Sequence, residues 1–219
     1  MRRIVLSLTL ALLATGNACA SPSNPANGAE FRTLAQAQTT QKVDGKVEVI
    51  EFFMYHCPAC YAVDAPLTAW AKKNENKVNF RRIHLSNGDL RDFEARLYVT
   101  LEALQLQDAM YGKVLQAWHQ EHRRLRSDEE NLNWALRSGI DKEKFLSAYN
   151  SFGVSMRLKS LARMAESYQI TGTPTIVVNG KYVTEPTMVA QANPQLARDQ
   201  VVAAAIQVLD ILVERSISK

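Results

Sequence analysis

Two cysteines three positions apart, Cys57 and Cys60, directly follow an apolar run of the chain at residues 49–54. A run of this kind with one acid inside it is typical of a strand that is buried on both faces of a sheet. Pro58 follows the first cysteine, and proline is favoured at the first position of a helix, where its missing N–H costs nothing. The pattern therefore predicts a buried strand that leads into a helix with Cys57 at its N-cap.

This placement has a chemical consequence for the two thiols. The unpaired N–H groups and the positive dipole end at the start of a helix favour the thiolate form of Cys57. A stabilised thiolate is a good leaving group, and it also favours the reduced state of the pair. We expect Cys57 to be the exposed nucleophile and leaving group, and Cys60 to be the buried resolving thiol. The pair is therefore suited to donating a disulfide.

Half of a zinc site is the alternative interpretation of the same two cysteines. Tetrahedral zinc needs two further ligands. The sequence has no second CxxC, and the nearest candidates are His56 and His84. The proline inside the motif and the apolar strand before it favour redox chemistry over metal binding.

The first twenty residues predict export of the protein. Residues 1–20 have a basic start, an apolar stretch and a small-residue cleavage site at Ala18-Cys19-Ala20, as signal peptides do. We therefore expect a periplasmic protein that has lost Cys19. A lipid anchor at Cys19 is the alternative, since residues 21–30 resemble a flexible tether. After cleavage, a disulfide between Cys57 and Cys60 would close too short a loop to stabilise a fold, so its purpose is reactive.

Charge gives no indication of a nucleic-acid partner. The formal net charge is +4, and the basic residues Arg123, Arg124 and Arg126 are followed by three acids at 128–130. This mixture is ordinary for a solvated surface. A nucleic-acid-binding face would show a basic stripe interleaved with aromatic residues, and we expect no such partner.

Strand patterns alternate with helical periodicity in a recognisable order. Apolar runs or alternation predict strands at residues 31–34, 47–54, 78–84, 175–178 and 181–183. Asn179-Gly180 is a hairpin turn signal between the last two strands. Helical periodicity fills residues 89–168, where we expect four or five short helices in a separate lobe. Asn193 and Pro194 are the expected cap and first residue of a final helix that ends near Ser216.

A βαβ unit followed later by ββα is the thioredoxin arrangement. We therefore predict an α/β protein with a thioredoxin-like fold and an inserted all-helical lobe. The expected regions are a signal peptide (1–20), a flexible leader (21–30), the first part of the thioredoxin-like domain (31–88), the helical insertion (89–168) and the second part of the domain (169–219).

Four motifs together resemble the DsbA family of exported thiol–disulfide oxidoreductases, over nearly the whole mature length. These motifs are Glu51-Phe52-Phe53, Cys57-Pro58-Ala59-Cys60-Tyr61, Thr173-Pro174 and Val178-Asn179-Gly180-Lys181-Tyr182. The resemblance implies the same fold and a CxxC redox centre. It also implies a reoxidising membrane partner of the DsbB type, linked to a quinone.

Glu51 is an acid on an otherwise apolar strand. Burial would raise its pKa and allow it to exchange a proton with Cys60 as that thiol attacks or leaves. The resemblance implies the same role for an acid at this position. The alternative is a glutamate that is exposed at an edge or paired with Arg81 or Arg82 on the neighbouring strand, and such pairing does not exclude a proton-transfer role.

An ordinary trans proline at a turn is the alternative for Pro174, but a cis peptide bond beside the two cysteines is expected, because the thioredoxin arrangement places a cis proline there. The backbone before it would pair with a bound peptide as an added strand. Thr173 and Ala59 depart from the family pattern, since the best-known members carry valine at the first position and the strongly oxidising ones histidine at the second. His56, next to Cys57, is a candidate substitute for the missing histidine, or else an ordinary surface residue.

The function that follows is oxidation of cysteines in newly secreted proteins through a mixed disulfide at Cys57. We expect reduced, unfolded secreted proteins as substrates, a monomer, and no metal or organic cofactor. One rival is a reductase or isomerase of the same fold. The other is a redox-inert binding protein or chaperone that keeps the fold without turnover.

Overall fold

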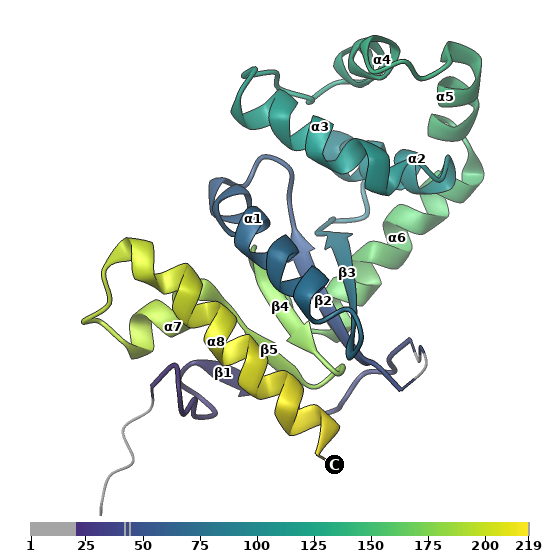
Figure 1. The fold of residues 1–219 in the computed structure, drawn as a ribbon. Coiled ribbons are helices and arrows are strands. Elements are labelled where there is room, and N and C mark those ends of the chain that lie inside the picture. Colours follow the sequence, from purple (N-terminus) through teal and green to yellow (C-terminus); the bar gives the residue numbers. More distant parts are fainter. Residues whose placement is uncertain (1–20, 42, 44, 219) are drawn as a thin grey trace, which may run out of the picture.

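The computed structural model describes residues 21–41, 43 and 45–218. Its strands are β1 (Phe31–Thr33), β2 (Val47–Phe53), β3 (Val78–His84), β4 (Thr175–Val178) and β5 (Tyr182–Thr184). Its helices are α1 (Pro58–Lys73), α2 (Phe93–Ala103), α3 (Gln107–His119), α4 (Asp128–Arg137), α5 (Lys142–Tyr149), α6 (Phe152–Ser167), α7 (Pro186–Ala192) and α8 (Arg198–Ile217). Figure 1 shows these elements as one sheet with helices around it. The α/β class and the predicted order of strands and helices are confirmed, except that an additional helix, α7, precedes the last one.

The five strands form one sheet in the order β1-β5-β4-β2-β3. The β2–β3 pair is parallel, and the other pairs are antiparallel. Every residue of β2 is buried, because strands pair with it on both edges and helices cover both faces. The start of α1 and its two cysteines therefore follow directly from the most enclosed strand of the sheet.

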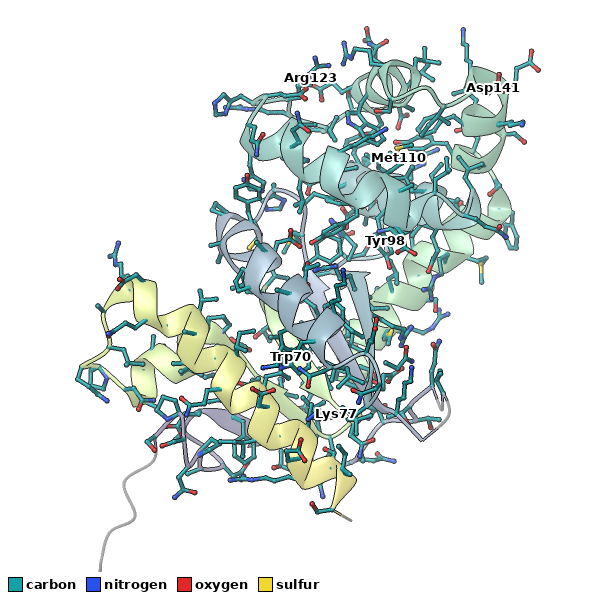
Figure 2. The ribbon with its side chains drawn as sticks, viewed as in Figure 1. Trp70, Lys77, Tyr98, Met110, Arg123 and Asp141 are labelled. Atoms are coloured by element: carbon teal, nitrogen blue, oxygen red, sulfur yellow. The ribbon has the colours of Figure 1, made fainter. Side chains whose placement is uncertain are left out.

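The side chains of β2 contribute to two apolar clusters, one shared with α1 and α8 and the other with the helical insertion. Val47 and Val49 pack with residues of α1 and α8, among them Trp70. The Trp70 indole N–H also donates to Asp210 Oδ1 of α8 at 2.6 Å, between the two helices shown in Figure 2. These contacts hold the C-terminal half of α1 against the sheet and α8.

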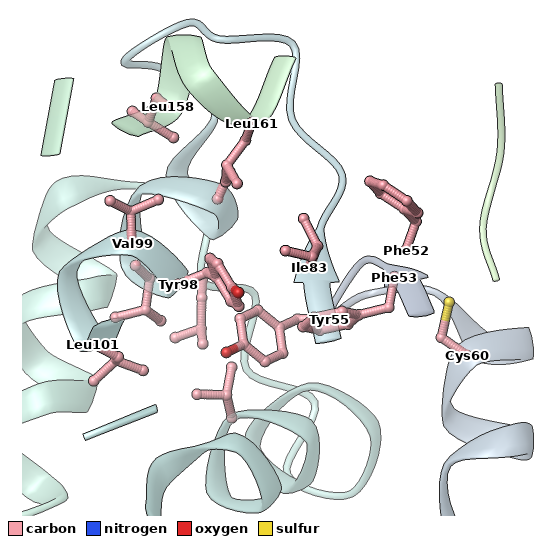
Figure 3. Packing of buried hydrophobic residues seen from close by; sticks show 14 of the residues in the cluster. Phe52, Phe53, Tyr55, Cys60, Ile83, Tyr98, Val99, Leu101, Leu158 and Leu161 are labelled. Carbon is pink, nitrogen blue, oxygen red and sulfur yellow. The ribbon is translucent and has the colours of Figure 1, made fainter. Parts of the chain in front are cut away.

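The second cluster joins β2 to the helical insertion. Phe52, Phe53 and Ile83 share one continuous cluster with Leu101 of α2 and Leu161 of α6 (Figure 3). The insertion consists of five helices, within the predicted four or five, and its apolar core is continuous with that of the sheet. Cys60 lies at the end of this cluster beside Phe53.

The chain between β5 and the last helix differs from the prediction. An additional helix, α7, precedes α8, which begins at Arg198 rather than at Pro194. Asn193 is the C-cap of α7, not the N-cap of the final helix. Its buried amide donates to Glu30 Oε1 at 3.1 Å and to the Val189 carbonyl at 3.0 Å. Glu30 is distant in the sequence and leaves no local signal around Asn193, where Asn-Pro is otherwise typical of a helix start.

The structure also differs from the expected flexible leader at residues 21–30. Glu30 is fully buried, and its Oε2 accepts the backbone N–H of Ala26 at 3.0 Å. The Arg215 guanidinium of α8 donates to the Pro25 carbonyl at 2.9 Å. A buried carboxylate needs hydrogen-bond partners, and these partners order the segment against the domain.

The predicted signal peptide and Cys19 lie outside the described residues. Within residues 21–218, apart from the two undescribed positions 42 and 44, no helix has the length and apolar character that a membrane span requires.

Candidate active site

Cys57 is the N-cap of α1, as the motif predicts. Its backbone is extended, with φ −72° and ψ 113°, and Pro58 occupies the first helical turn. The Cys60 backbone N–H donates to the Cys57 Sγ at 3.2 Å. The sulfur therefore accepts one of the N–H groups that have no partner within the helix.

Both cysteines are free thiols; Cys60 is buried as expected, whereas Cys57 is more enclosed than its proposed role suggests. Cys57 is 8% exposed and Cys60 1%. The expectation of an exposed Cys57 therefore needs correction, although Cys57 is the more accessible of the two. The covering contact is the Thr173 carbonyl, which lies 3.5 Å from the Cys57 Sγ. Pro58 and Ala59 are exposed beside it.

The environment of the two sulfurs separates their acidities. A hydrogen bond from the Cys60 thiol, together with the backbone N–H groups of Cys60 and Ala59, lowers the pKa of Cys57 to about 5, against the opposing effect of burial. The same thiol–sulfur hydrogen bond and burial raise the pKa of Cys60. The reduced pair thus holds one negative charge, on Cys57, and one proton, on Cys60.

The Thr173–Pro174 peptide bond is cis, as predicted. The Thr175 hydroxyl donates to the Gly172 carbonyl at 2.8 Å and closes the turn that leads into β4. This turn brings the Thr173 carbonyl to the Cys57 sulfur across the antiparallel β2–β4 pair.

Glu51 lies on β2, fully buried between Arg82 of β3 and Ile176 of β4. Its Oε2 accepts from the Arg82 Nε at 2.9 Å, whereas Oε1 has no hydrogen-bond partner within the described part of the chain. Burial raises the pKa of Glu51 to about 7, and the Arg82 guanidinium only partly offsets it. The structure therefore combines the two alternatives considered from the sequence: Glu51 is paired with Arg82 and also has a raised pKa.

Arg82 links Glu51 to two polar side chains of α1 that the sequence did not single out. Its Nη2 donates to Asp64 Oδ1 at 3.0 Å and to Thr68 Oγ1 at 2.7 Å. The guanidinium also lies over the Tyr111 ring, 4.5 Å from its centre. A cavity of about 610 Å³ opens beside these residues and leads toward solvent.

His56 is joined to Glu94, a residue of α2 that the sequence reasoning missed. The imidazole Nδ1 lies 2.9 Å from both carboxylate oxygens, and the His56 backbone N–H donates to Oε2 at 3.0 Å. The buried His84 also lies near Glu94, with its Nε2 3.8 Å from Oε2. No spacing in the sequence marks Glu94, because it comes from another element.

A second aromatic contact near the motif joins α1 to α3. The Tyr61 ring stacks on His119 at 4.3 Å between ring centres, and the Tyr61 hydroxyl accepts from Gln120 at 2.8 Å. His119 Nε2 donates in turn to the Tyr55 carbonyl at 2.8 Å. Helix α3 of the insertion is thereby fixed to the loop that precedes Cys57.

Comparison with known proteins agrees with this geometry. The family described as the DSBA-like thioredoxin domain matches residues 48–199. The thiol:disulfide interchange protein DsbA of Burkholderia cepacia is 35% identical over 218 residues, covering 98% of this chain and 97% of that protein. DsbA of Pseudomonas aeruginosa is 35% identical over 182 residues, covering 83% of this chain and 86% of that protein.

A solved structure gives the same result. The crystal structure of Pseudomonas aeruginosa DsbA superposes with a TM-score of 0.74 at 31% identity, covering 87% of this chain and 94% of that one. The Cys57–Cys60 pair fits the CxxC active site of such proteins. The chain therefore belongs to the DsbA-like thioredoxin family and is a thiol:disulfide oxidoreductase.

Proposed function

We propose that the protein is a periplasmic oxidase that donates its Cys57–Cys60 disulfide to reduced, unfolded secreted proteins. The observation that carries this direction is the asymmetry of the two thiols, with the pKa of Cys57 lowered and that of Cys60 raised. A stabilised Cys57 thiolate favours the reduced pair and therefore makes its disulfide a good oxidant.

The first step is attack of a substrate thiolate on the Cys57 sulfur of the disulfide. The Cys57–Cys60 bond breaks, a substrate–Cys57 bond forms, and Cys60 leaves with the electron pair. Because the pKa of Cys60 is raised, it takes up a proton at once. This protonation prevents Cys60 from attacking the mixed disulfide and reversing the step.

In the second step another thiolate of the substrate attacks the substrate sulfur of the mixed disulfide. The substrate disulfide forms and Cys57 leaves as a thiolate, which the N–H groups at the start of α1 stabilise. In sum, the substrate loses two electrons and the protein gains them, ending with a Cys57 thiolate and a Cys60 thiol.

Glu51 is proposed as the group that exchanges a proton with Cys60. A carboxyl with a pKa of about 7 holds a proton in about half of the molecules at neutral pH, so it can give or accept one there. Its Oε1 has no protein partner among the described residues and is free to bond a proton carrier.

Thr173 and Pro174 are proposed to position the substrate. The backbone beside Pro174 would pair with an extended peptide as an added strand, with the substrate sulfur directed to Cys57. The closeness of the Thr173 carbonyl to the Cys57 sulfur supports this arrangement. Pro58, Ala59 and His56 form the exposed surroundings of Cys57 and would adjust its reactivity.

A DsbB-type membrane oxidant is proposed to reoxidise the reduced pair. The relatives named DsbA support a periplasmic location, reached through the signal peptide at residues 1–20. We propose that the protein works as a monomer and without a metal or organic cofactor. The helical insertion at 89–168 belongs to the same catalytic unit as the thioredoxin-like parts at 31–88 and 169–219.

The deciding experiment is oxidation of a dithiol peptide by catalytic amounts of the protein, with oxidised glutathione as the terminal oxidant. The expected result is many peptides oxidised per protein molecule. A reductase would instead favour the reverse reaction, and a redox-inert binding protein would show no turnover. Equilibration with glutathione should give a reduction potential less negative than that of thioredoxin, which is about −270 mV. A value as reducing as that of thioredoxin would favour the reductase.

A further inference from the structure

His56 directly precedes Cys57 and is held by one carboxylate through two donors. Its backbone N–H and its ring Nδ1 both lie within hydrogen-bond distance of Glu94, at 3.0 Å and 2.9 Å. The first contact fixes the loop, and the second fixes the orientation of the ring. Glu94 is ionised, since His56 and His84 lower its pKa to about 2 although burial alone would raise it. A carboxylate only accepts, so the imidazole Nδ1 is the donor.

The other groups that face His56 come from several elements. The Trp118 ring of α3 lies 5.9 Å from the imidazole, and the guanidinium of Arg126 lies over the same indole. The hydrogen bond to Glu94 raises the pKa of His56, the negative Cys57 sulfur adds to this, and burial and Arg126 oppose it. The side chain of His56 remains 41% exposed.

We propose that Glu94 is a positioning residue that holds His56 as an imidazolium beside Cys57, and that this cation stabilises the Cys57 thiolate. The proposal rests on Cys57 being the reacting thiolate in the proposed function. Ala59 contributes no charge within the motif, whereas His56 is adjacent to Cys57 in the chain and interacts electrostatically with it. Glu94 belongs to α2, so the helical insertion contributes to the reactivity of the redox centre.

The proposal has a reciprocal consequence. If the imidazolium favours the thiolate, formation of the thiolate favours the imidazolium by the same factor. Reduction of the disulfide must then raise the pKa of His56. The effect on the thiol–disulfide equilibrium exists between the pKa of Cys57 and that of His56. It is lost as the pH rises through the pKa of His56, because the imidazole becomes neutral there.

The test uses His56→Gln, which keeps a side-chain amide to donate to Glu94 but carries no charge. The thiolate absorbance gives the pKa of Cys57, and equilibration with glutathione gives the oxidising strength. In His56→Gln we expect a raised Cys57 pKa. We also expect an oxidising equilibrium constant about threefold to tenfold lower at about pH 6, with less than about a twofold change at about pH 8.5. The matched control is His122→Asn, an exposed histidine outside this cluster, which should match the wild type at both pH values.

Two further variants distinguish the loss of the His56 charge from the effect of the Glu94 carboxylate, which has no imidazolium partner once His56 is replaced. In Glu94→Gln, nuclear magnetic resonance of the His56 ring should show a lowered pKa, since the anion is gone. The double variant His56→Gln/Glu94→Gln should still have a Cys57 pKa above that of the wild type. A double variant that returns to the wild-type value would overturn the proposal, because the effect would then belong to the unpaired carboxylate.

Other results also decide against it. An equal change at both pH values would indicate a structural role for His56, and so would a His56 pKa that is the same in oxidised and reduced protein. The proposed function fails separately, because it requires the wild type itself to turn over a dithiol peptide. If the wild type turns over but His56→Gln leaves the Cys57 pKa unchanged, only this inference is overturned and the proposed function stands.

Discussion

At the scale of single residues, the chemistry depends on how differently two nearby sulfurs are surrounded. Cys57 accepts N–H groups at the start of α1, whereas Cys60 lies one turn further in, against Phe53 in the shared core. The same helix terminus that stabilises one thiolate is too far from the other to help it, and burial opposes charge on both.

Replacing each cysteine in turn tests this division of roles. Cys60→Ala removes the resolving thiol, so mixed disulfides at Cys57 should accumulate and survive acid quenching. Cys57→Ala should abolish both turnover and adducts, because Cys60 is buried and its pKa is raised. Non-reducing gels of the two variants, produced in an oxidising compartment, measure the adducts. Equal adduct yields from the two variants would contradict the assignment.

Glu51→Gln should stabilise the protein in a pH-dependent manner. The pKa of Glu51 is raised on folding from 4.5 to about 7, so the folded protein binds the proton more tightly than the unfolded chain. Its contribution to stability is therefore fully present below about pH 4.5 and is lost as the pH rises through about 7. Removing the charge should raise the free energy of unfolding by about 1–3 kcal/mol at about pH 8.

Urea unfolding of wild type and Glu51→Gln across this range measures the difference. The gain should be near zero at about pH 4.5 and should grow toward neutrality. A gain that is independent of pH would indicate repacking around Arg82 rather than titration of Glu51. If the proposed proton exchange with Cys60 is correct, Glu51→Gln should also oxidise the dithiol peptide more slowly than the wild type does.

At the scale of elements, helices and strands distant in the sequence are joined by a few buried polar contacts. Glu30 precedes β1, and its carboxylate accepts from Asn193 at the end of α7. The Thr184 hydroxyl of β5 donates to the Glu30 carbonyl at 2.7 Å. These bonds place α7 and the start of the domain beside the hairpin edge of the sheet.

Asn193→Ala should therefore destabilise the protein by about 1–3 kcal/mol, because the fully buried Glu30 loses a donor. The exposed Gln195, two residues further on, supplies the matched control Gln195→Ala, which should change the free energy of unfolding by less than about 0.5 kcal/mol. Thermal or urea unfolding compares the two variants. If Asn193→Ala leaves the free energy of unfolding nearly unchanged, the Glu30 carboxylate does not need the hydrogen bond from the Asn193 amide.

At the scale of the whole molecule, the insertion and the sheet share one apolar core. Folding of either part alone would expose the face that the other covers. The stacked rings of Tyr61 and His119 join α1 to α3, so the contact between the sheet domain and the insertion extends to the edge of the active site. We therefore expect the thioredoxin-like parts and the insertion to unfold together in one cooperative transition.

Single-tryptophan variants can measure this cooperativity. Trp70 reports on the α1–α8 side of the sheet, whereas Trp134 lies in the buried core of the insertion. With the other two tryptophans replaced by Phe, each variant should give coincident unfolding midpoints by fluorescence and by far-ultraviolet circular dichroism. In the variant that keeps only Trp134, a fluorescence midpoint below the circular-dichroism midpoint would show that the insertion unfolds as a separate domain.

The sequence by itself determined the features that depend on neighbours along the chain. The start of α1 at Pro58 follows from a proline after an N-cap residue, and the turn at Asn179-Gly180 follows from residues that tolerate positive φ. The β2 strand follows from its apolar run. Each of these is decided by steric and hydrogen-bonding preferences within a few residues, so the redox motif and the order of elements were predictable.

Only the tertiary structure decided how those elements meet. Asn193 resembles a helix cap in the sequence but ends α7, because a buried Glu30 takes its amide. His56 and Glu94 lie on different elements, and no spacing predicts their pairing. The pKa of Glu51 depends on strands and helices that exclude water from β2. Burial and long-range electrostatics belong to the packed molecule, because the unfolded chain leaves each of these groups in water.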